Sequence, residues 1–439
     1  MHPKVLLEAC TDLVRLALKF DHPADAIVSR FFREHRGLGP RERATLAETV
    51  YAVLRKKLRF EHFAPSGSGP RERRLAILGL ADCLAQDAPQ RPAAGDRSQQ
   101  DFLRAALTDQ EAAWLAQCQQ VRTEDLMERH RHNLPEWLVA PLKEQLGDEF
   151  WPLVHSLEQG AGLDLRVNEL QAKRAEVQKE LARAGIPAVP TPFSPWGLRV
   201  AGKPPLNKLE VFTRGAVEVQ DEGSQLLALL VDAKRGEMVV DFCAGAGGKT
   251  LALGASMRST GRLYAFDTSA HRLDALKPRL ARSGLSNVHP AAIAHERDDR
   301  VKRLAGKLDR VLVDAPCSGL GTLRRNPDLK WRQSVQAVEE MALRQASILQ
   351  GAARMVKSGG RLVYATCSVL PQENEAIAEA FSAAHPDFEV LSAGEVLSGL
   401  KVEQASQLCS GGPDGQRYLR LWPHRHATDG FFAAVWHKK

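Results

Sequence analysis

The sequence lacks the long apolar runs that membrane-spanning proteins carry. Its longest uninterrupted apolar stretches, such as Leu226–Val231, fall far short of the ~18–20 residues that cross a bilayer. The N-terminal region carries Glu8 and Asp12 inside its apolar pattern, so it does not form the hydrophobic segment of a signal peptide. We therefore expect a protein that works away from the membrane.

Cysteine is scarce, and no CxxC pair occurs. The 439 residues include 7 cysteines, which is an odd number spread thinly over a long chain. A disulfide framework or a zinc site is therefore not expected, and no metal is assigned; free thiols fit a reducing cytoplasm. With 44% hydrophobic and 26% charged residues, the composition excludes a mainly disordered or fibrous chain and is typical of a globular protein. The length corresponds to two or three domains.

The charge is unevenly distributed. Lys and Arg number 60 against 53 Asp and Glu, which gives a net charge of +7. The segment Arg30–Arg74 alone holds twelve basic and five acidic residues. A concentrated positive field attracts polyanions such as nucleic acids. A solvated helical surface has the same composition, so charge alone leaves both interpretations open.

Residues 1–130 are predicted to be helical. Apolar residues recur at helical spacing along two stretches, namely Leu6, Cys10, Leu13, Ala17 and Phe20, and then Ala47, Val50, Tyr51 and Leu54. Gly37, Gly39 and Pro40 interrupt the chain before the second stretch. The polar segment Gln86–Gln100 has no periodicity and is predicted to be a loop. We expect these apolar stripes to form a core.

The remaining chain is predicted to contain two parts. Residues 131–217 indicate a small α+β module with strands at Leu163–Val167, Gly197–Val200 and Glu210–Phe212 and a helix at Lys173–Ala184. From residue 218 strands alternate with helices, which predicts an α/β domain with a parallel, doubly wound sheet over 218–439. Its expected strands are Met238–Asp241, Arg262–Asp267, Arg310–Asp314, Arg361–Thr366 and Phe431–Trp436. Its expected helices follow the stripes Leu273, Leu276, Leu280 and Val338, Met341, Ile348, Ala352, Met355.

A glycine-rich turn, DFCAGAGGKT at 241–250, follows the first of these strands and opens a helix at Lys249. A phosphate-binding P-loop needs glycine where this chain has Cys243, so that interpretation fails. The alternative is an adenosine-type cofactor, whose ribose hydroxyls need an acidic residue at the end of the next strand. Asp267 stands there. An Asp at this place can instead cap the following helix, a role that Ser269 can share.

Two cysteines follow two strands directly, in DAPCSG (314–319) and in TCS (366–368). Parallel strands carry such residues to the carboxyl edge of the sheet, where ligands bind. A pair of this kind suits cytosine C5 chemistry, because a thiolate that adds to C6 makes C5 nucleophilic. Asp314 is positioned to stabilise the ring, and a second group must assist release. Spacing alone does not rank Cys317 against Cys367. Cys10, Cys83, Cys118 and Cys409 are taken as small hydrophobic residues.

Several motifs together resemble one family. DFCAGAGGKT, DAPCSG, ATCS, RRNPDLKW (324–331) and DGFF (429–432) are similar to the RsmB/NOP/NSUN family of S-adenosylmethionine-dependent RNA cytosine-C5 methyltransferases, over residues 131–439. RERATLAETVYAVLRKK (41–57) resembles the NusB-like RNA-binding domain of the bacterial ribosomal RNA members. The resemblance implies a helical NusB-like region (1–130), a small α+β RNA-binding module (131–217) and a Rossmann-like, seven-stranded methyltransferase sheet (218–439).

The resemblance also implies roles for individual residues. Cys367 is the implied nucleophile, Cys317 assists product release, and Asp314 orients the base near the methyl group of the cofactor. The residues implied to hold S-adenosyl-L-methionine are Cys243, Ala244, Gly245, Ala246, Gly247, Gly248, Lys249, Asp267 and Asp314. Gln220, Glu222 and Ser224 in VQDEGSQ shape the pocket floor. The residues expected to face RNA are Arg166, Asn168, Arg324, Arg325, Lys330 and Trp331, by phosphate contact or base stacking.

The sequence departs from the family at two places. Gly245-Ala246 stands where the family commonly has Ala-Pro. His295 stands where the family often supplies an Asp near the adenine, and Glu296 or Asp298 are candidates to replace it. We expect a monomer that methylates ribosomal RNA. A tRNA substrate, a non-catalytic RNA-binding assembly factor and a DNA enzyme with its nucleophile in the Pro-Cys motif are the alternatives.

Overall fold

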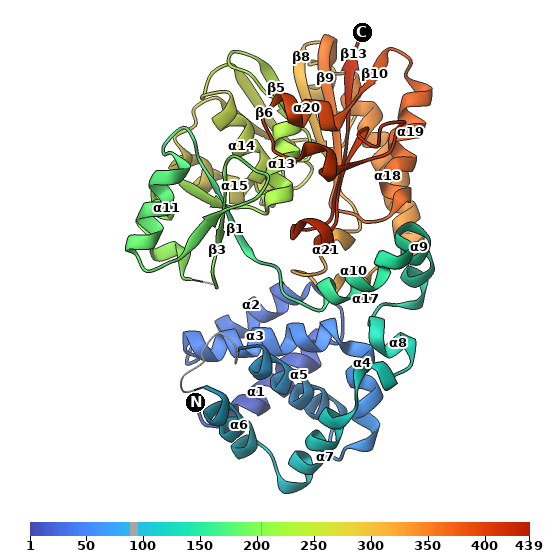
Figure 1. The fold of residues 1–439 in the computed structure, drawn as a ribbon. Coiled ribbons are helices and arrows are strands. Elements are labelled where there is room, and N and C mark those ends of the chain that lie inside the picture. Colours follow the sequence, from blue (N-terminus) through green and yellow to red (C-terminus); the bar gives the residue numbers. More distant parts are fainter. Residues whose placement is uncertain (88–94, 203) are drawn as a thin grey trace. The chain divides into compact units, whose positions relative to one another are not determined.

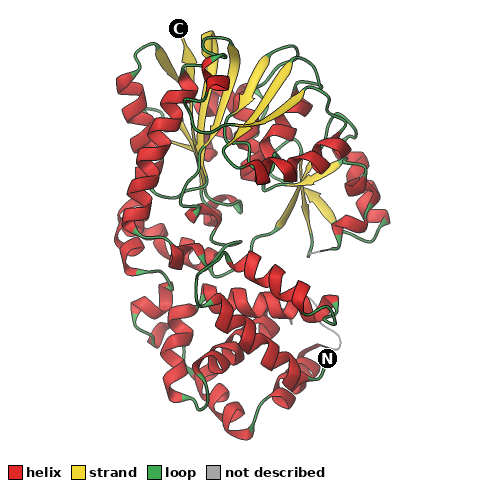
Figure 2. Ribbon diagram, turned by 180° about the vertical axis from the view of Figure 1, so that it is seen from behind, coloured by secondary structure: helices red, strands yellow, loops and turns green. Residues whose placement is uncertain are grey.

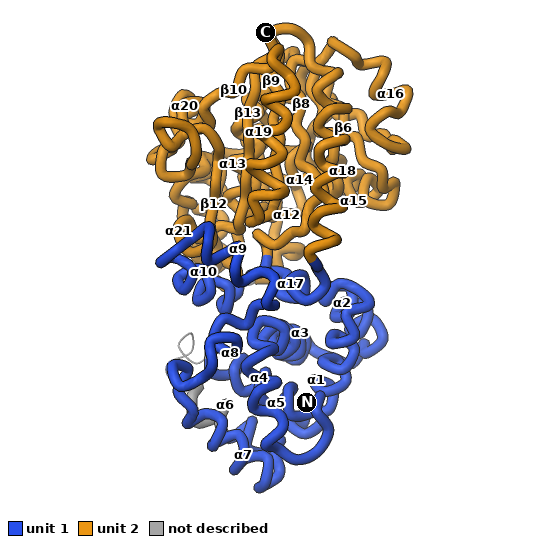
Figure 3. Tube along the Cα trace, turned by 90° about the vertical axis from the view of Figure 1, so that its right-hand side faces the viewer, with its two compact units in different colours: residues 1–160, 323–334 blue, residues 161–322, 335–439 orange. Residues whose placement is uncertain are grey.

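The computed structural model describes residues 1–87, 95–202 and 204–439. Its contacts divide the chain into two compact units, coloured separately in Figure 3. Unit 1 comprises Met1–Gly160 and Leu323–Ser334, and unit 2 comprises Ala161–Thr322 and Val335–Lys439. The segment 323–334 thus leaves the second unit and packs with the first. The three-part domain division stays a prediction.

Unit 1 is built from helices (Figure 1), and buried apolar residues between Leu6 and Cys118 form one core in it. They are α1 (Pro3–Ala17), α2 (Ala24–Glu34), α3 (Pro40–Arg55), α4 (Lys57–Phe63), α5 (Arg71–Asp87), α6 (Gly95–Ala106), α7 (Asp109–Gln120), α8 (Glu128–His132), α9 (Glu136–Leu146), α10 (Phe150–Leu157) and α17 (Leu329–Arg332). The predicted stripe of α1 is confirmed, because Leu6, Cys10, Leu13 and Ala17 are buried. Val50 and Leu54 of α3 are buried in the same core.

The predicted loop Gln86–Gln100 is wrong at both ends. Helix α5 continues to Asp87, and α6 begins at Gly95, so only a short connection separates them. Residues 88–94 of that prediction lie outside the described residues. The polar composition suggested a loop, but Phe102 and Leu103 in the second half of α6 pack against the core.

Unit 2 begins with a small antiparallel sheet in the order β2-β3-β1-β4. Its strands are β1 (Leu163–Val167), β2 (Ala188–Pro190), β3 (Gly197–Val200) and β4 (Val217–Val219), with helices α11 (Arg174–Arg183) and α12 (Glu210–Thr213). The predicted strands at β1 and β3 are confirmed. The predicted strand Glu210–Phe212 is wrong, because these residues form α12. Three residues are too few to distinguish a helical from an extended period.

The large sheet of unit 2 has nine strands, where the family resemblance implied seven. They are β5 (Met238–Asp241), β6 (Arg262–Asp267), β7 (Val288–Ala292), β8 (Leu308–Asp314), β9 (Val356–Thr366), β10 (Phe388–Leu391), β11 (Cys409–Ser410), β12 (Tyr418–Leu421) and β13 (Phe431–Lys438). The order is β11-β12-β13-β9-β8-β5-β6-β7, and β10 also pairs with β13. The extra strands arise because one half of β13 pairs with β12 and the other half with β10. The five strands predicted from residue 218 onward are all present.

The sheet is mixed rather than wholly parallel. Strands β7, β6, β5, β8 and β9 run parallel, whereas β13 is antiparallel to β9. Alternate residues of β9 enter two different cores, with Val363 and Ala365 on one face and Leu362 and Tyr364 on the other. Figure 2 shows helices on both faces of this sheet. The predicted α/β, doubly wound fold is therefore confirmed.

Helices of unit 2 complete the two faces. They are α13 (Glu222–Val231), α14 (Gly248–Ser256), α15 (Ala270–Ser283), α16 (Asp299–Lys302), α18 (Val335–Ala353), α19 (Glu375–Ala384), α20 (Ala393–Gly399) and α21 (Pro423–His426). The stripe Leu273 and Leu276 of α15 is buried on one face, and Ile348 and Ala352 of α18 on the other. Within the described residues, no helix combines the length and apolarity that crossing a membrane requires.

Candidate active site

The glycine-rich turn connects β5 to α14 and has a backbone that only glycine accommodates. Gly247 has φ +82, and a Cβ built on it lies 2.2 Å from the Cδ1 atom of Leu276. Gly245 also has a positive φ, of +55. A side chain at position 247 would therefore collide with α15 and strain the backbone. The turn fixes the backbone amides of the first residues of α14 at the carboxyl edge of the sheet.

Asp267 braces this turn from the end of β6. Its Oδ2 accepts a hydrogen bond of 2.8 Å from the Gly245 amide, and its Oδ1 accepts one of 2.7 Å from the Ser269 amide. The cap of α15 is Ser269, whose hydroxyl accepts the Arg272 amide at 3.3 Å. Of the two roles that the sequence left open, helix capping thus belongs to Ser269. Ribose binding by Asp267 stays a prediction.

Asp241, which the sequence analysis left without a role, is fully buried under the turn. Its Oδ2 accepts a hydrogen bond of 2.7 Å from the Thr250 hydroxyl, while its Oδ1 has no hydrogen-bond partner. Burial raises the pKa of Asp241 to about 7. The signal in the sequence was an acidic residue that ends β5 immediately before the glycine turn. Buried orphan oxygens of this kind are costly and mark functional positions.

Lys249 and Asp314 form a partly buried ion pair. Lys249 lies in the first turn of α14 and Asp314 ends β8, and the Nζ–Oδ2 distance is 2.6 Å. Burial by itself lowers the pKa of Lys249, but the charge of Asp314 and their hydrogen bond outweigh it, so the pKa is raised. The amine therefore stays protonated. The structure thus brings together two of the residues that the resemblance implies to hold the cofactor.

The two cysteines lie side by side. Cys317 follows β8 and Cys367 follows β9, which pairs with β8 in parallel, and the distance between their Sγ atoms is 3.3 Å. The hydrogen bond with Cys367 and burial raise the pKa of Cys317 well above the ordinary value. Either sulfur can donate in this contact, and the raised pKa of Cys317 favours the arrangement in which Cys317 keeps its proton and donates to Cys367.

The late DGFF motif closes the same site. The Gly321 amide donates to the Cys367 carbonyl at 2.8 Å, and the Gly430 amide donates to the Gly321 carbonyl at 2.8 Å. A Cβ on Gly321 would lie 2.0 Å from the carbonyl oxygen of Gly430. The loops after β8 and β9 and the loop before β13 are thereby held in backbone contact.

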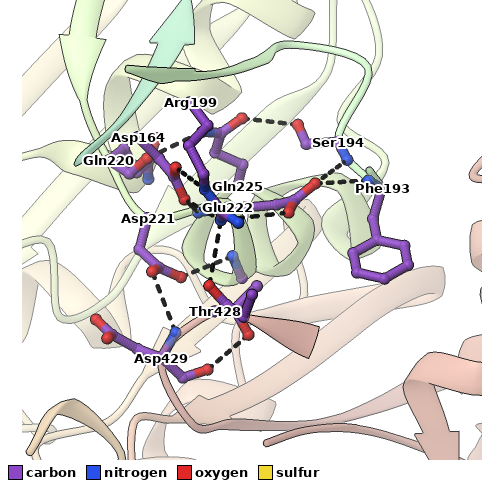
Figure 4. A network of polar contacts seen from close by, with 12 residues as sticks. Asp164, Phe193, Ser194, Arg199, Gln220, Asp221, Glu222, Gln225, Thr428 and Asp429 are labelled. Carbon is purple, nitrogen blue, oxygen red and sulfur yellow. Dashed lines mark hydrogen bonds and ion pairs between the residues drawn. The ribbon is translucent and has the colours of Figure 1, made fainter. Parts of the chain in front are cut away.

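The residues Gln220–Gln225 form a polar network with the small sheet, shown in Figure 4. The Oε1 of buried Glu222 accepts the amides of Phe193 and Ser194 at 2.6 and 2.7 Å. Burial raises the pKa of Glu222. The Oε1 of Gln220 accepts the Nε of Arg166 at 2.6 Å, and its Nε2 donates to the Ser224 hydroxyl at 3.2 Å. The motif VQDEGSQ therefore joins the small sheet to α13.

Several residues predicted to face RNA are engaged within the chain. Arg166 is only 2% exposed, and burial lowers its pKa to about 10. The side-chain amide of Asn168 donates to the Gly215 and Ser283 carbonyls. Lys330, which is 4% exposed, donates to the Arg55 carbonyl at 2.8 Å, and burial lowers its pKa to about 7. These side chains hold the fold together, and their contact with RNA stays a prediction.

Other residues of RRNPDLKW (324–331) are likewise engaged within the chain, because this segment packs with the helices of unit 1. The Trp331 indole donates to the Leu54 carbonyl at 2.8 Å, and Arg324 donates to the Gly160 carbonyl at 3.2 Å. Arg325 is partly buried in the same segment. The predicted RNA contacts of these residues are likewise untested, and what the structure shows is how the segment docks against α3 and the end of α10.

The residues His295, Glu296 and Asp298, at the place where the family often has an Asp near the adenine, form hydrogen bonds within the chain. The Oε1 of Glu296 accepts the Ser347 hydroxyl at 2.6 Å. Asp298 caps α16, accepting the Arg300 and Ala294 amides at 2.8 and 3.0 Å. The Nδ1 of exposed His295 accepts the Arg297 amide at 3.0 Å. Both carboxylates proposed as replacements thus already stabilise this loop.

The basic segment of unit 1 divides into two kinds of side chain. Many of its cations pair with carboxylates, including Lys56 with Asp82 at 2.5 Å and Arg73 with Glu111 at 2.6 Å. A second group is exposed along α2 and the turn into α3, namely Arg30, Arg33, Arg36 and Arg41. Because these four arginines are exposed, they can offer their charges to a polyanion.

Comparison with known proteins gives consistent matches along the chain. The family described as "16S rRNA methyltransferase RsmB/F" matches residues 228–437. The family described as "Methyltr_RsmF/B-like, ferredoxin-like domain" matches residues 134–207.

Individual relatives extend over more of the chain. A probable ribosomal RNA small subunit methyltransferase B of Synechocystis is 31% identical over 94% of this chain and 95% of its own length. The Bacillus subtilis protein of the same name is 34% identical over 70% of this chain and 66% of its own. Among solved structures, a methyltransferase homologue protein from Pyrococcus horikoshii has a TM-score of 0.61 and 26% identity, covering 71% of this chain and 97% of its own.

Proposed function

The chain belongs to the RsmB/F family of ribosomal RNA methyltransferases, and on this premise we propose that it methylates C5 of a cytosine in ribosomal RNA. It is an RNA methyltransferase whose methyl donor is S-adenosylmethionine. The observation that carries the cytosine-C5 assignment is the pair of thiols 3.3 Å apart at the strand ends that also carry the Lys249–Asp314 pair. Methyl transfer to a nitrogen or an oxygen has no use for two thiols.

The residues at the glycine turn fit S-adenosylmethionine. A Cβ built on Gly245 would meet nothing within 4 Å, so a ligand can approach the backbone of the turn closely at this position. Asp267 has one backbone hydrogen bond to each oxygen and therefore keeps acceptor capacity for ribose hydroxyls. When bound, the donor supplies a methyl group on a positively charged sulfur.

This arrangement supports a reaction that proceeds through a covalent bond between Cys367 and C6 of the cytosine. The Cys367 thiolate forms a bond from its Sγ to C6 of the cytosine, and the ring electrons move to C5. S-adenosylmethionine, held by the glycine turn and Asp267, would supply the methyl group to C5 and keep the electron pair of its sulfur–carbon bond. Loss of the C5 proton to water restores the C5–C6 double bond. The electron pair of the S–C6 bond returns to Cys367, which is regenerated as a thiolate.

Three side chains assist these steps. The Cys317 thiol, which donates to Cys367, favours the thiolate before attack and stabilises it again when it leaves. The carboxylate of Asp314 is an acceptor for the N3/N4 edge of the base. Lys249 holds that carboxylate by a 2.6 Å hydrogen bond and balances its charge in the buried site.

A methyl-transfer assay tests the proposal. Protein is incubated with labelled S-adenosylmethionine and, in separate reactions, ribosomal RNA, tRNA and DNA. We expect label in ribosomal RNA as 5-methylcytosine, and its loss to background in Cys367→Ala. Cys409→Ala is the matched control, because Cys409 lies far from both cysteine loops in sequence and donates to the Ala405 carbonyl. Label confined to tRNA or DNA, or none with the wild type, contradicts the proposal.

A further inference from the structure

A buried carboxylate that no part of the reaction scheme uses lies behind the two cysteines. Glu373 ends the short 3-10 helix η7 (Pro371–Glu373), which follows β9 and the TCS motif. Its exposed fraction is 0%. Burying a carboxylate is costly unless its oxygens are fully hydrogen-bonded. Glu373 meets that condition, because both of its oxygens accept hydrogen bonds from other residues of this chain.

Each oxygen of Glu373 accepts two hydrogen bonds. The Oε1 accepts the Ser318 amide at 2.8 Å and the Gln345 side-chain amide at 3.0 Å. The Oε2 accepts the Ser318 hydroxyl at 2.5 Å and the Ser368 hydroxyl. Ser318 directly follows Cys317, and Ser368 directly follows Cys367. One carboxylate therefore ties together the residues after both thiols.

Further bonds hold the carboxylate in place. Gln345 of α18 also donates to the Pro316 carbonyl at 2.9 Å, just before Cys317. The Tyr364 hydroxyl of β9 donates to the Glu373 backbone carbonyl at 2.6 Å. Tyr364 and Gln345 are both buried. The carboxylate is thus fixed from the sheet and from a covering helix, so it can set the distance between the loops.

We propose that Glu373 is a positioning residue for methyl transfer, which sets the spacing of Cys317 and Cys367 and keeps the proton on Cys317. This inference rests on the proposed function, because it concerns the thiols assigned to that reaction. Glu373 touches neither base nor donor in this account. It acts through Ser318 and Ser368, whose backbones carry the two cysteines.

The charge of Glu373 supports the second part of the proposal. The pKa of Cys317 is raised by its hydrogen bond with Cys367 and by burial, and the negative charges of Cys367 and Glu373 add to the effect. The carboxylate of Glu373, which accepts hydrogen bonds from Ser318, therefore opposes ionisation of the Cys317 thiol. That thiol must keep its proton in order to donate to Cys367. A neutral residue of the same shape keeps the packing but removes this charge.

Glu373→Gln separates positioning from folding, because glutamine keeps the volume and one acceptor oxygen. The serine hydroxyls can rotate to accept from its amide. Glu237→Gln is the matched control. Glu237 is a partly buried carboxylate at the start of β5, ion-paired with Arg310 at 3.1 Å, at the opposite end of the strands from the cysteines.

Thiol alkylation across a pH series tests the proposal without RNA or methyl donor. Folded protein is treated with iodoacetamide from pH 6 to 10, and the labelled cysteine is located by mass spectrometry. In the wild type and in Glu237→Gln we expect Cys367 to react well before Cys317. In Glu373→Gln we expect the Cys317 profile to move to lower pH and the preference for Cys367 to fall ~10-fold or more. Unchanged profiles in a folded Glu373→Gln protein overturn the proposal, even if the variant unfolds at a lower temperature.

Methylation kinetics supply the second readout. A misplaced reacting group of about 1 Å costs on the order of 100-fold in rate, so we expect kcat of Glu373→Gln to fall ~10–100-fold with KM for RNA unchanged. Glu373→Asp keeps the charge on a shorter side chain. Relative to Glu373→Gln, it should recover more of the alkylation preference for Cys367 than of kcat. A kcat equal to that of the wild type refutes the positioning role. Failure of the wild type to methylate RNA refutes the proposed function instead and leaves the alkylation test standing.

Discussion

Asp267 shows how one side chain can serve both the fold and a ligand. It braces the glycine turn through the Gly245 amide, and each of its oxygens keeps acceptor capacity for a further donor. We expect Asp267→Ala to weaken S-adenosylhomocysteine binding ~10–100-fold, since charge-assisted hydrogen bonds contribute ~1.5–3 kcal/mol. Isothermal calorimetry measures this. Asp274→Ala, which removes an exposed carboxylate on the same side of the site, should bind normally. An Asp267→Ala protein that is folded and binds with wild-type affinity shows that Asp267 only braces the turn.

Asp241 predicts a pH dependence of stability. Its pKa is raised by burial to about 7 in the folded state, so the fold favours the neutral acid. The raised pKa of Asp241 adds to the free energy of unfolding. This contribution is fully present below the unfolded-state pKa near ~4, and it is lost as the pH rises toward 7. Asp241→Asn cannot ionise. The stability of this variant relative to the wild type should therefore increase from pH 5 to pH 7, by at most ~1.4 kcal/mol per pH unit.

Urea unfolding at pH 5, 6, 7 and 8 measures that difference. Asp309→Asn serves as the control. Burial of Asp309 opposes its ionisation, but the hydrogen bonds from Lys357 and the Met238 amide and the nearby positive charges together outweigh burial and lower its pKa, so it stays ionised throughout this range. The control should show no trend. A flat difference between Asp241→Asn and the wild type would mean that Asp241 is charged in the folded protein.

Much of the candidate site follows from residues that end strands. Cys317, Cys367, Asp314, Lys249 and Asp267 could be assigned to one edge of the sheet because the strands before them have clear apolar patterns. Glu373 could not be found this way, because its donors become neighbours only when β8 and β9 pair. Nor does charge in the sequence reveal that Lys330 is buried, since its partner Arg55 is 275 residues away.

At the scale of elements, the loops that carry Gly321 and Gly430 pack so closely that a single added methyl group should lower the stability of the protein. A Cβ on Gly321 would lie 2.0 Å from the Gly430 carbonyl oxygen, which belongs to the DGFF motif. We expect Gly321→Ala to destabilise the protein by ~1–3 kcal/mol, because neither backbone can move without disturbing the cysteine loops. Gly399→Ala, at the end of α20, meets nothing within 4 Å and should change stability by less than ~1 kcal/mol. Equal urea midpoints for the two variants would contradict the close packing of these loops.

The strands that the sequence analysis did not predict are short or lie at an edge. Strand β7 contains Pro290, which fits only because β7 is the last strand of the sheet. Strands β10 and β12 have four residues each, and both depend on pairing with β13. Long amphipathic helices such as α1 and α3 were predictable, because their periodicity repeats over several turns.

At the scale of the whole molecule, residues 323–334 change how the basic segment has to be tested. Deleting residues 1–130 would leave Trp331 and Lys330 without the carbonyls of Leu54 and Arg55. Loss of RNA binding after such a deletion would therefore mix two effects. Substitution of exposed arginines leaves this docking intact.

We expect a variant with Arg30, Arg33, Arg36 and Arg41 replaced by Gln to bind ribosomal RNA more weakly. Each lost phosphate contact should lower the slope of log affinity against log salt by ~0.7–0.9. The matched control replaces Arg300, Lys302, Arg303 and Lys307, which are exposed in unit 2, and removes the same charge. Filter binding over a salt series gives the slopes. The same slope for the arginine variant and the wild type would show that this surface is only solvated.

The central claim is that Cys367 attacks the base and that Cys317 assists its release, and a denaturing gel tests both together. Cys317→Ala, Cys367→Ala and wild-type protein are incubated with S-adenosylmethionine and substrate RNA, then separated under denaturing conditions. Without Cys317, the hydrogen bond that stabilises the leaving thiolate is lost, so we predict a covalent protein–RNA band for Cys317→Ala. Cys367→Ala should give neither the band nor methylated product. A covalent band from Cys367→Ala, and none from Cys317→Ala, would contradict the account and make Cys317 the nucleophile.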